Sequence, residues 1–161
     1  MKRVNEILKH PLYTQNMELN TTTEATWPYC KHDIIHLMDV ARIAYIINLE
    51  KGYGFSKEII YAAALLHDIT KWKQIAHGVP HNESAIEPAT EILRDCGFSG
   101  DEISQICTAI LNHRKGSKDK KDKFSQILYK ADKLSRACYF CNYEKKTCNW
   151  DKKKRNTLLE V

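Results

Sequence analysis

Apolar residues recur along this chain at the spacing of amphipathic helices, and no segment shows the strict two-residue alternation of a half-buried strand. The longest apolar pattern covers residues 29–51 and ends at Gly52, because glycine readily adopts the conformation that ends a helix. The next pattern begins after the capping residue Ser56 and carries His67 and Asp68 at its C-terminal end. Further helices are predicted over residues 2–9, 82–96 with a kink or restart at Pro88, 101–113, 124–143 and 150–159.

The predicted order of helices and loops describes one compact unit. The chain has 161 residues, and a domain typically takes ~100–200 residues. We expect loops at residues 71–80 and 115–123, and a loop or helix cap at 20–24. The expected fold is therefore all-α, a single-domain helical bundle. Residues 29–143 form the domain, residues 1–28 an N-terminal extension packed on it, and residues 144–161 a C-terminal helical tail.

Composition narrows the class of protein only slightly. Hydrophobic residues make up 43% and charged residues 28% of the chain, as in ordinary soluble proteins. No stretch approaches the ~20 apolar residues of a membrane helix, and the N-terminus lacks the apolar run of a secretory signal, so we expect a cytoplasmic protein without a membrane partner. The net charge of +5 arises largely from basic runs at 115–123 and 152–155, which we interpret as solvated surface. No aromatic residues alternate with these bases, so we do not expect a nucleic-acid partner.

Six cysteines raise the question of a metal site. Cys138 and Cys141 form a C-x-x-C pair, with Cys148 further along the chain. Because the N-terminus lacks a secretory signal, we expect reduced thiols. Four thiolates at paired spacing would suggest a zinc or iron–sulfur site. Because only one pair is present, we expect Cys138 and Cys141 to pack in the core.

Several ionisable residues fall on apolar helix faces, where a packed core is expected. His36 precedes Val40 by four residues, and the doublet of His67 and Asp68 follows an apolar run. His113 and Asp132 occupy similar places on two later helices. Each residue alone is better explained as a hydrogen-bonded core or surface residue. Together they favour a divalent cation, because buried carboxylates are costly unless they are paired or bound to metal.

These residues resemble the HD superfamily of metal-dependent phosphohydrolases. The resemblance is carried by residues 36–44, 63–71 and 128–134, in which His36, the His67-Asp68 doublet and Asp132 stand in the family's order. It extends over about residues 30–140 and implies that these four residues bind one metal.

His81 and His113 extend this resemblance toward one branch of the superfamily. The order His, His-Asp, His, His, Asp is similar to that of bacterial diadenosine-tetraphosphate hydrolases. It implies a second metal held by Asp68, His81 and His113, with Asp68 shared. The alternative is one metal, with His81 and His113 binding phosphate or water. The lysine-rich segment before Asp132 and the cysteine-containing tail depart from this branch, which leaves the substrate open.

Three other histidines stay ambiguous. His32 precedes His36 by one helical turn and is either its partner or the ligand in its place. His77 lies in the same predicted loop as His81 and competes with it as a ligand. His10 is expected at the surface.

The resemblance implies an enzyme that cleaves a nucleotide phosphate ester or anhydride with metal-activated water. Asp68 and Lys71 are the expected catalytic residues, and Lys71, Arg114 and Arg136 the expected phosphate-binding residues. Iron or manganese suits mixed His and carboxylate ligands best, with zinc, nickel and magnesium as alternatives.

Other interpretations stay open. Within the enzyme class they are a one-metal nucleoside-monophosphate phosphatase and a di-iron oxygenase. Outside it they are an inactive regulatory or binding module of the same fold, and a structural zinc protein that uses the late cysteines. The sequence also leaves a homodimer open.

Overall fold

The structure, a computed structural model, describes residues 1–141, 148 and 155–160 and contains no strand in these residues. Its α-helices are α1 (Lys2–Lys9), α2 (Pro11–Thr23), α3 (Ile34–Lys51), α4 (Lys57–Leu66), α5 (Lys71–His77), α6 (His81–Ser84), α7 (Ile86–Asp95), α8 (Gly100–Asn112) and α9 (Lys123–Leu134). A short 3-10 helix, Cys138–Phe140, follows. The predicted all-α fold is confirmed. None of the helices in the described part of the chain is long and apolar enough to span a bilayer.

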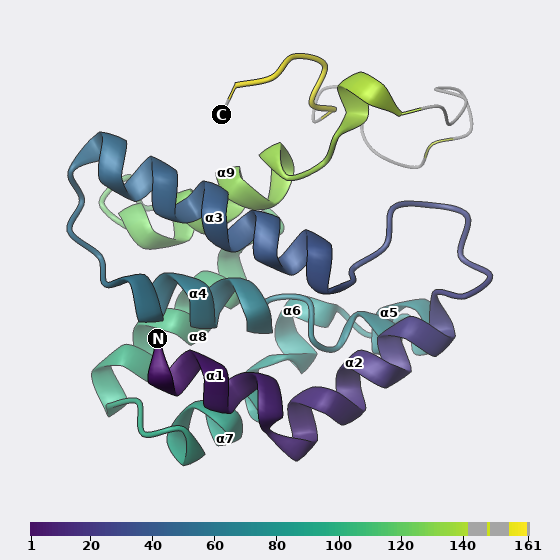
Figure 1. The fold of residues 1–161 in the computed structure, drawn as a ribbon, viewed down its shortest axis with the longest axis horizontal. Helices are drawn as coiled ribbons and strands as arrows, with labels where there is room; N and C mark the ends of the chain where they lie inside the picture. Colours follow the sequence, from purple (N-terminus) through teal and green to yellow (C-terminus); the bar gives the residue numbers. More distant parts are fainter. Residues whose placement is uncertain (142–147, 149–154, 161) are drawn as a thin grey trace.

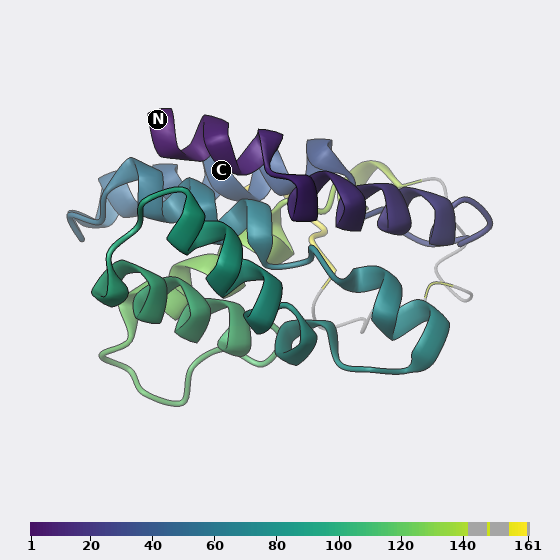
Figure 2. The ribbon, with the colours of Figure 1, turned by 90° about the horizontal axis from the view of Figure 1, so that it is seen from below.

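The bundle is organised around α3 and α4, which lie side by side (Figure 1). Helix α9 packs on α3, and α8 packs on α4, α7 and α9. Helices α1 and α2 follow one edge, where α1 contacts α4 and α2 contacts α5 (Figure 2). The core contains mainly Leu, Ile and Ala, including the continuous run 62–66 at the end of α4. This packing brings the C-terminal end of α4 to the middle of the molecule.

Local capping sets where the helices begin. The Asp33 side chain accepts a hydrogen bond from the His36 backbone N–H (3.0 Å), so α3 begins at Ile34 and not at residue 29. Ser56 caps α4 as expected, accepting from Ile59. Gly52, with φ of 62°, ends α3 in the left-handed conformation.

Residues 71–77 form a helix where the sequence predicts a loop. Trp72 is the reason: its backbone N–H and its indole N–H donate to the side chains of Asn20 (2.8 Å) and Asn16 (2.9 Å) on α2. These long-range bonds have no local signature, whereas Gly78 ends α5 as a C-cap. The expected interruption near Pro88 is confirmed as a restart, because Pro88 lies in the first turn of α7, where its missing N–H costs little.

The C-terminal part differs most from the prediction. Helix α9 ends at Leu134 instead of continuing to residue 143. Cys138 is half-buried and Cys141 exposed, so the expectation that they pack in the core is wrong. Residues 155–160 contain no helix, and the rest of the expected helix at 150–159 lies outside the described residues. Asn156 donates to the Leu134 backbone oxygen (3.0 Å), which holds this segment at the end of α9.

Replacing Ile7 with alanine tests how strongly α1 contributes to stability. Ile7 is 0% exposed and belongs to the hydrophobic core. Ile7→Ala should lower the free energy of unfolding by about 2–5 kcal/mol, measured by urea denaturation. Leu8→Ala, at an exposed neighbouring position, is the control and should change it by less than about 0.5 kcal/mol. Equal effects of the two substitutions would show that α1 is not docked as described.

Candidate metal centre

Six buried side chains from α3, α6, α9 and the residues that follow α4 and α8 converge in the middle of the bundle. His67 and Asp68 directly follow α4, and His113 follows α8. Each of the six is at most 6% exposed, and the six are His36, His67, Asp68, His81, His113 and Asp132. They form two groups, in each of which the candidate ligand atoms lie within 4.8 Å of one another. One contains His36, His67, Asp68 and Asp132, and the other contains Asp68, His81 and His113.

Asp68 belongs to both groups because its two oxygens face opposite ways. Oδ2 lies 3.0 Å from Nε2 of His67 and 3.5 Å from Nε2 of His36. Oδ1 lies 3.0 Å from Nε2 of His81 and 3.6 Å from Nε2 of His113. The Asn20 side chain donates to the Asp68 backbone oxygen (3.0 Å), which ties this residue to α2. A carboxylate in this position is suited to bridge two cations.

Hydrogen bonds at Nδ1 determine which nitrogen of each imidazole is available. Nδ1 of His67 donates to the Ala64 carbonyl (2.7 Å), and Nδ1 of His113 donates to the Ile110 carbonyl (2.6 Å). Both bonds reach back three residues into the last turn of the preceding helix. A carbonyl can only accept, so in the neutral imidazole the lone pair is on Nε2, which faces Asp68.

His81 follows the same rule through a side chain, since its Nδ1 contacts the Gln74 amide oxygen on α5 (2.5 Å). Its Nε2 lies 2.9 Å from Nε2 of His113. Two neutral imidazoles with lone pairs facing each other at this distance repel unless a proton or a metal ion lies beside them. The pKa of His81 is lowered to about 4 by burial, which keeps this ring neutral and able to bind metal.

Two residues that follow α9 fix the orientation of the His36 ring. The Ser135 hydroxyl donates to the Asp132 carbonyl (2.8 Å) and so accepts from Nδ1 of His36 (3.0 Å). Arg136 donates through Nη2 to Nε2 of His36 (3.0 Å) and through Nη1 to the Lys31 carbonyl (2.7 Å). Burial and the Arg136 charge lower the pKa of His36 to about 4. Arg136 therefore occupies the nitrogen that a metal ion would need.

The unsatisfied polar atoms of the centre fit a bound cation. Nε2 of His67 and Oδ1 of Asp68 are buried and make no well-directed hydrogen bond within the described residues, although each lies 3.0 Å from a partner of the centre, Oδ2 of Asp68 and Nε2 of His81 respectively. Such atoms are costly in a protein interior. Imidazole and carboxylate are common ligands of divalent transition metals, and each Nδ1–H is anchored by an outer hydrogen bond, as metal-binding histidines require. The donor set thus fits two divalent ions that share Asp68.

The protonation of His67 makes metal binding at this centre measurable as a release of protons. Burial disfavours its charged form, but the charges of Asp68 and Asp132 prevail and raise its pKa to about 10. Below that pH the ring holds a proton that a metal ion on Nε2 must displace. Metal binding near neutral pH should therefore release about one proton, and affinity should rise with pH. Titration calorimetry with Mn²⁺ in two buffers of different ionisation enthalpy measures this release, and a buffer-independent heat would contradict it.

Positive charges line one side of the centre. Lys133 pairs with Oδ2 of Asp132. Burial lowers the pKa of Lys71. The carboxylates of Asp68 and Asp132 oppose this shift, whereas the charges of Arg136 and Arg114 add to it. Lys71 therefore lies within electrostatic reach of both groups. Arg114 is exposed and donates to the Asn82 side chain (3.4 Å), so it lies at the rim rather than inside.

The three ambiguous histidines have different positions. His32 is buried, with its Nε2 3.9 Å from Oδ2 of Asp68 and its backbone N–H and Nδ1 on the Glu24 carboxylate. It lies beside the centre and outside both groups of candidate ligands. His77 is exposed and contacts the Trp72 ring, so it does not compete with His81. His10 caps α2 and lies 3.2 Å from Asp95.

Four residues around the centre were not identified from the sequence. Gln74, Ser135 and Lys133 each contact a histidine or aspartate of the centre, and Glu24 holds the neighbouring His32. Gln74 and Glu24 lie in segments read as loops, so no helix face suggested them. Ser135 and Lys133 adjoin the end of α9, but a serine or lysine there is common without such a role.

Comparison with known proteins agrees with this geometry. The HD domain family matches residues 33–137. An uncharacterized protein of Clostridium beijerinckii is 45% identical over 157 residues, which are 97% of each chain. The crystal structure of a predicted HD superfamily hydrolase from an uncultured Thermotogales bacterium superposes with a TM-score of 0.58 at 27% identity, covering 77% of this chain and 68% of that one. This chain belongs to the HD domain family.

Proposed function

We propose that this protein is a metal-dependent phosphohydrolase that cleaves a phosphate ester or anhydride of a nucleotide. The observation that carries the proposal is the position of Asp68, whose two oxygens face two separate groups of ligands. His36, His67, Asp68 and Asp132 would hold one divalent ion, and Asp68, His81 and His113 the other. When bound, such ions lower the pKa of water to give a nucleophile near neutral pH and offset the charge on phosphoryl oxygens.

The protein's own contribution is to orient the ligands and to bind phosphate. The carbonyls of Ala64 and Ile110 keep the imidazole protons of His67 and His113 on Nδ1. Lys71 places an ammonium near Asp68 and Asp132, where it can donate to a phosphoryl oxygen. Arg136 supplies a planar guanidinium that suits two phosphate oxygens. Arg114, at the rim, reaches a more distant phosphate.

Arg136 links metal binding to phosphate binding. Its bond to Nε2 of His36 must break before this nitrogen can bind metal. Nε of Arg136 is buried and has no hydrogen-bond partner. An incoming phosphate would satisfy donors that metal binding releases, so metal and substrate are expected to support each other's binding.

Within this function we propose a substrate like diadenosine tetraphosphate. Support comes from the resemblance of the ligand order to that branch and from the presence of both middle histidines, His81 and His113, beside Asp68. In a one-metal phosphatase acting on nucleoside monophosphates, these two rings, whose Nε2 atoms lie 2.9 Å apart, would bind only phosphate or water. Iron or manganese is the proposed metal, since mixed imidazole and carboxylate ligands suit both.

The test is hydrolysis of a panel of nucleotides by chelator-treated protein reloaded with Mn²⁺ or Fe²⁺. The panel should include diadenosine tetraphosphate, nucleoside triphosphates and nucleoside monophosphates, with products separated by anion-exchange chromatography. The proposal predicts release of mononucleotides from diadenosine tetraphosphate only in the presence of metal. Hydrolysis of nucleoside monophosphates alone would show that the substrate is a monophosphate instead. If no nucleotide of the panel is hydrolysed, the enzymatic function is rejected.

A further inference from the structure

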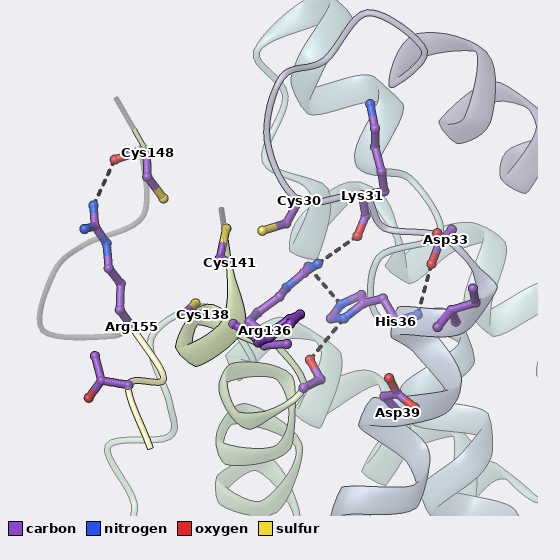
Figure 3. A pocket seen from close by; sticks show the side chains of 15 residues that line it. Cys30, Lys31, Asp33, His36, Asp39, Arg136, Cys138, Cys141, Cys148 and Arg155 are labelled. Carbon is purple, nitrogen blue, oxygen red and sulfur yellow. Dashed lines mark hydrogen bonds between the residues drawn. The ribbon is translucent and has the colours of Figure 1, made fainter. Parts of the chain in front are cut away.

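Four of the six cysteines gather around one pocket that adjoins the His/Asp centre. The pocket has a volume of about 800 Å³ and lies between the start of α3 and the segment that follows α9 (Figure 3). Cys30 comes from the loop before α3, and Cys138 and Cys141 from the 3-10 helix and the residue after it. Cys148 completes the set. These residues are brought together from segments that are more than a hundred positions apart in the sequence.

The thiols share this pocket closely enough to affect one another. In Figure 3 the sulfur atoms of Cys30 and Cys141 are turned toward each other. Desolvation raises the pKa of the Cys30 thiol. The charge of Arg136 opposes this shift, and the thiols of Cys138, Cys141 and Cys148 raise the pKa further. Such mutual effects require proximity. Each of the four is exposed or half-buried.

Core packing does not explain this arrangement. The other two cysteines, Cys96 and Cys107, pack against the hydrophobic core, as buried cysteines usually do. The four pocket cysteines lie outside that core cluster. A C-x-x-C pair, a third cysteine seven residues on and a fourth from a distant segment form the donor set of a four-thiolate centre.

The charges around the pocket suit thiolates. Lys31, Arg136 and Arg155 line it, alongside the carboxylates of Asp33 and Asp39. Four thiolates leave a net negative charge even with a divalent ion bound, and nearby cations offset it and favour the deprotonated ligand. We propose that Cys30, Cys138, Cys141 and Cys148 bind a metal centre through their sulfur atoms, as a zinc ion or an iron–sulfur cluster, separate from the His/Asp centre.

The spacing of the sulfurs indicates what binding changes. Among the described residues, no three of these sulfurs lie within 4.8 Å of one another. A zinc ion with Zn–S bonds of ~2.3 Å needs sulfurs only ~3.8 Å apart, so it must draw the segments together, whereas an iron–sulfur cluster is larger and holds its cysteines further apart. Both are thiolate centres, and their absorption spectra differ.

A thiolate centre here bears on the His/Asp centre through Arg136. This arginine donates to the carbonyl of Lys31, the residue after Cys30, and to His36. It also lies two residues before Cys138. Fixing Cys30 and Cys138 on one metal would fix the two ends between which the guanidinium is held. The thiolate centre therefore has a positioning role, and its presence does not depend on the proposed enzymatic function.

The test is the metal content and absorption spectrum of tag-free protein purified anaerobically without chelator. Zinc and iron are measured by mass spectrometry in wild type, Cys30→Ser, the double variant Cys138→Ser/Cys141→Ser, and the control Cys96→Ser. The proposal predicts about one thiolate centre per chain in wild type and Cys96→Ser, and its loss in both pocket variants. Visible absorption that bleaches on reduction identifies a cluster, and zinc without visible absorption identifies a single ion. Asp68→Asn should retain this metal, which separates the two centres.

A pocket variant that fails to fold would also lose its metal, so a second experiment uses the folded wild type. Titration of folded wild type with a mercurial should release the metal in step with thiol modification, while circular dichroism reports the fold. The proposal is overturned if the pocket variants and Cys96→Ser hold equal metal, if mercurial modification releases none, or if mass mapping of the anaerobic protein finds these cysteines in disulfides.

Discussion

Asp68→Asn should abolish hydrolysis, lowering kcat/KM by about 10³-fold or more. Removing a single stabilising donor from an active site costs ~10²–10³-fold, and Asp68 faces both groups of ligands. Asparagine keeps the shape but loses the charge and offers only one acceptor oxygen. Binding of both ions should weaken with the activity, as measured by equilibrium dialysis with Mn²⁺.

The control for Asp68→Asn is Asp101→Asn, which makes the same chemical change at an exposed position in the first turn of α8. It should leave kcat/KM and metal binding within about twofold of wild type. Circular dichroism of both variants checks the fold. If Asp68→Asn keeps full activity, the buried ligand cluster is not where the reaction takes place.

Arg136→Met should lower kcat/KM by about 10–10²-fold without loss of metal. Charge-assisted hydrogen bonds contribute ~1.5–3 kcal/mol each, and the buried guanidinium donates to His36. Methionine has a similar length and no donor. Because Arg136 donates to Nε2 of His36, its removal should leave Mn²⁺ affinity equal or higher.

Arg42→Met is the matched control, since Arg42 is exposed and paired with Asp39 (3.3 Å). Arg136→Lys should restore part of the activity, because it returns the charge without the fork of donors. Loss of metal binding in Arg136→Met, or unchanged KM and kcat, would show that Arg136 serves only to hold the loop before α3.

The convergence of these His and Asp side chains was predictable because the residues interrupt apolar helix faces. His36, His113 and Asp132 lie where periodicity places the core, and the doublet at 67–68 ends a fully apolar run. Periodicity reports which way a side chain faces, so it identifies buried polar residues well. It cannot report which atom of each ring is free, which depends on Nδ1 contacts such as that of His81 with Gln74.

What the sequence could not predict depends on contacts between distant segments. Helix α5 forms because Trp72 bonds to α2, and Glu24 matters only because the loop before α3 brings His32 to it. The cysteines are the clearest instance. Counting local pairs yields one C-x-x-C, whereas the fold places Cys30 beside it, 108 positions earlier than Cys138.

The most direct test of the central claim is an electron paramagnetic resonance titration of chelator-treated protein with Mn²⁺, a hard cation that does not favour thiolate ligands. Two ions sharing Asp68 predict binding of about two Mn²⁺ per chain with an exchange-coupled signal. His113→Gln should reduce this to about one uncoupled ion. Uncoupled binding in wild type, or an unchanged signal in His113→Gln, would contradict the shared carboxylate and with it the two-metal centre.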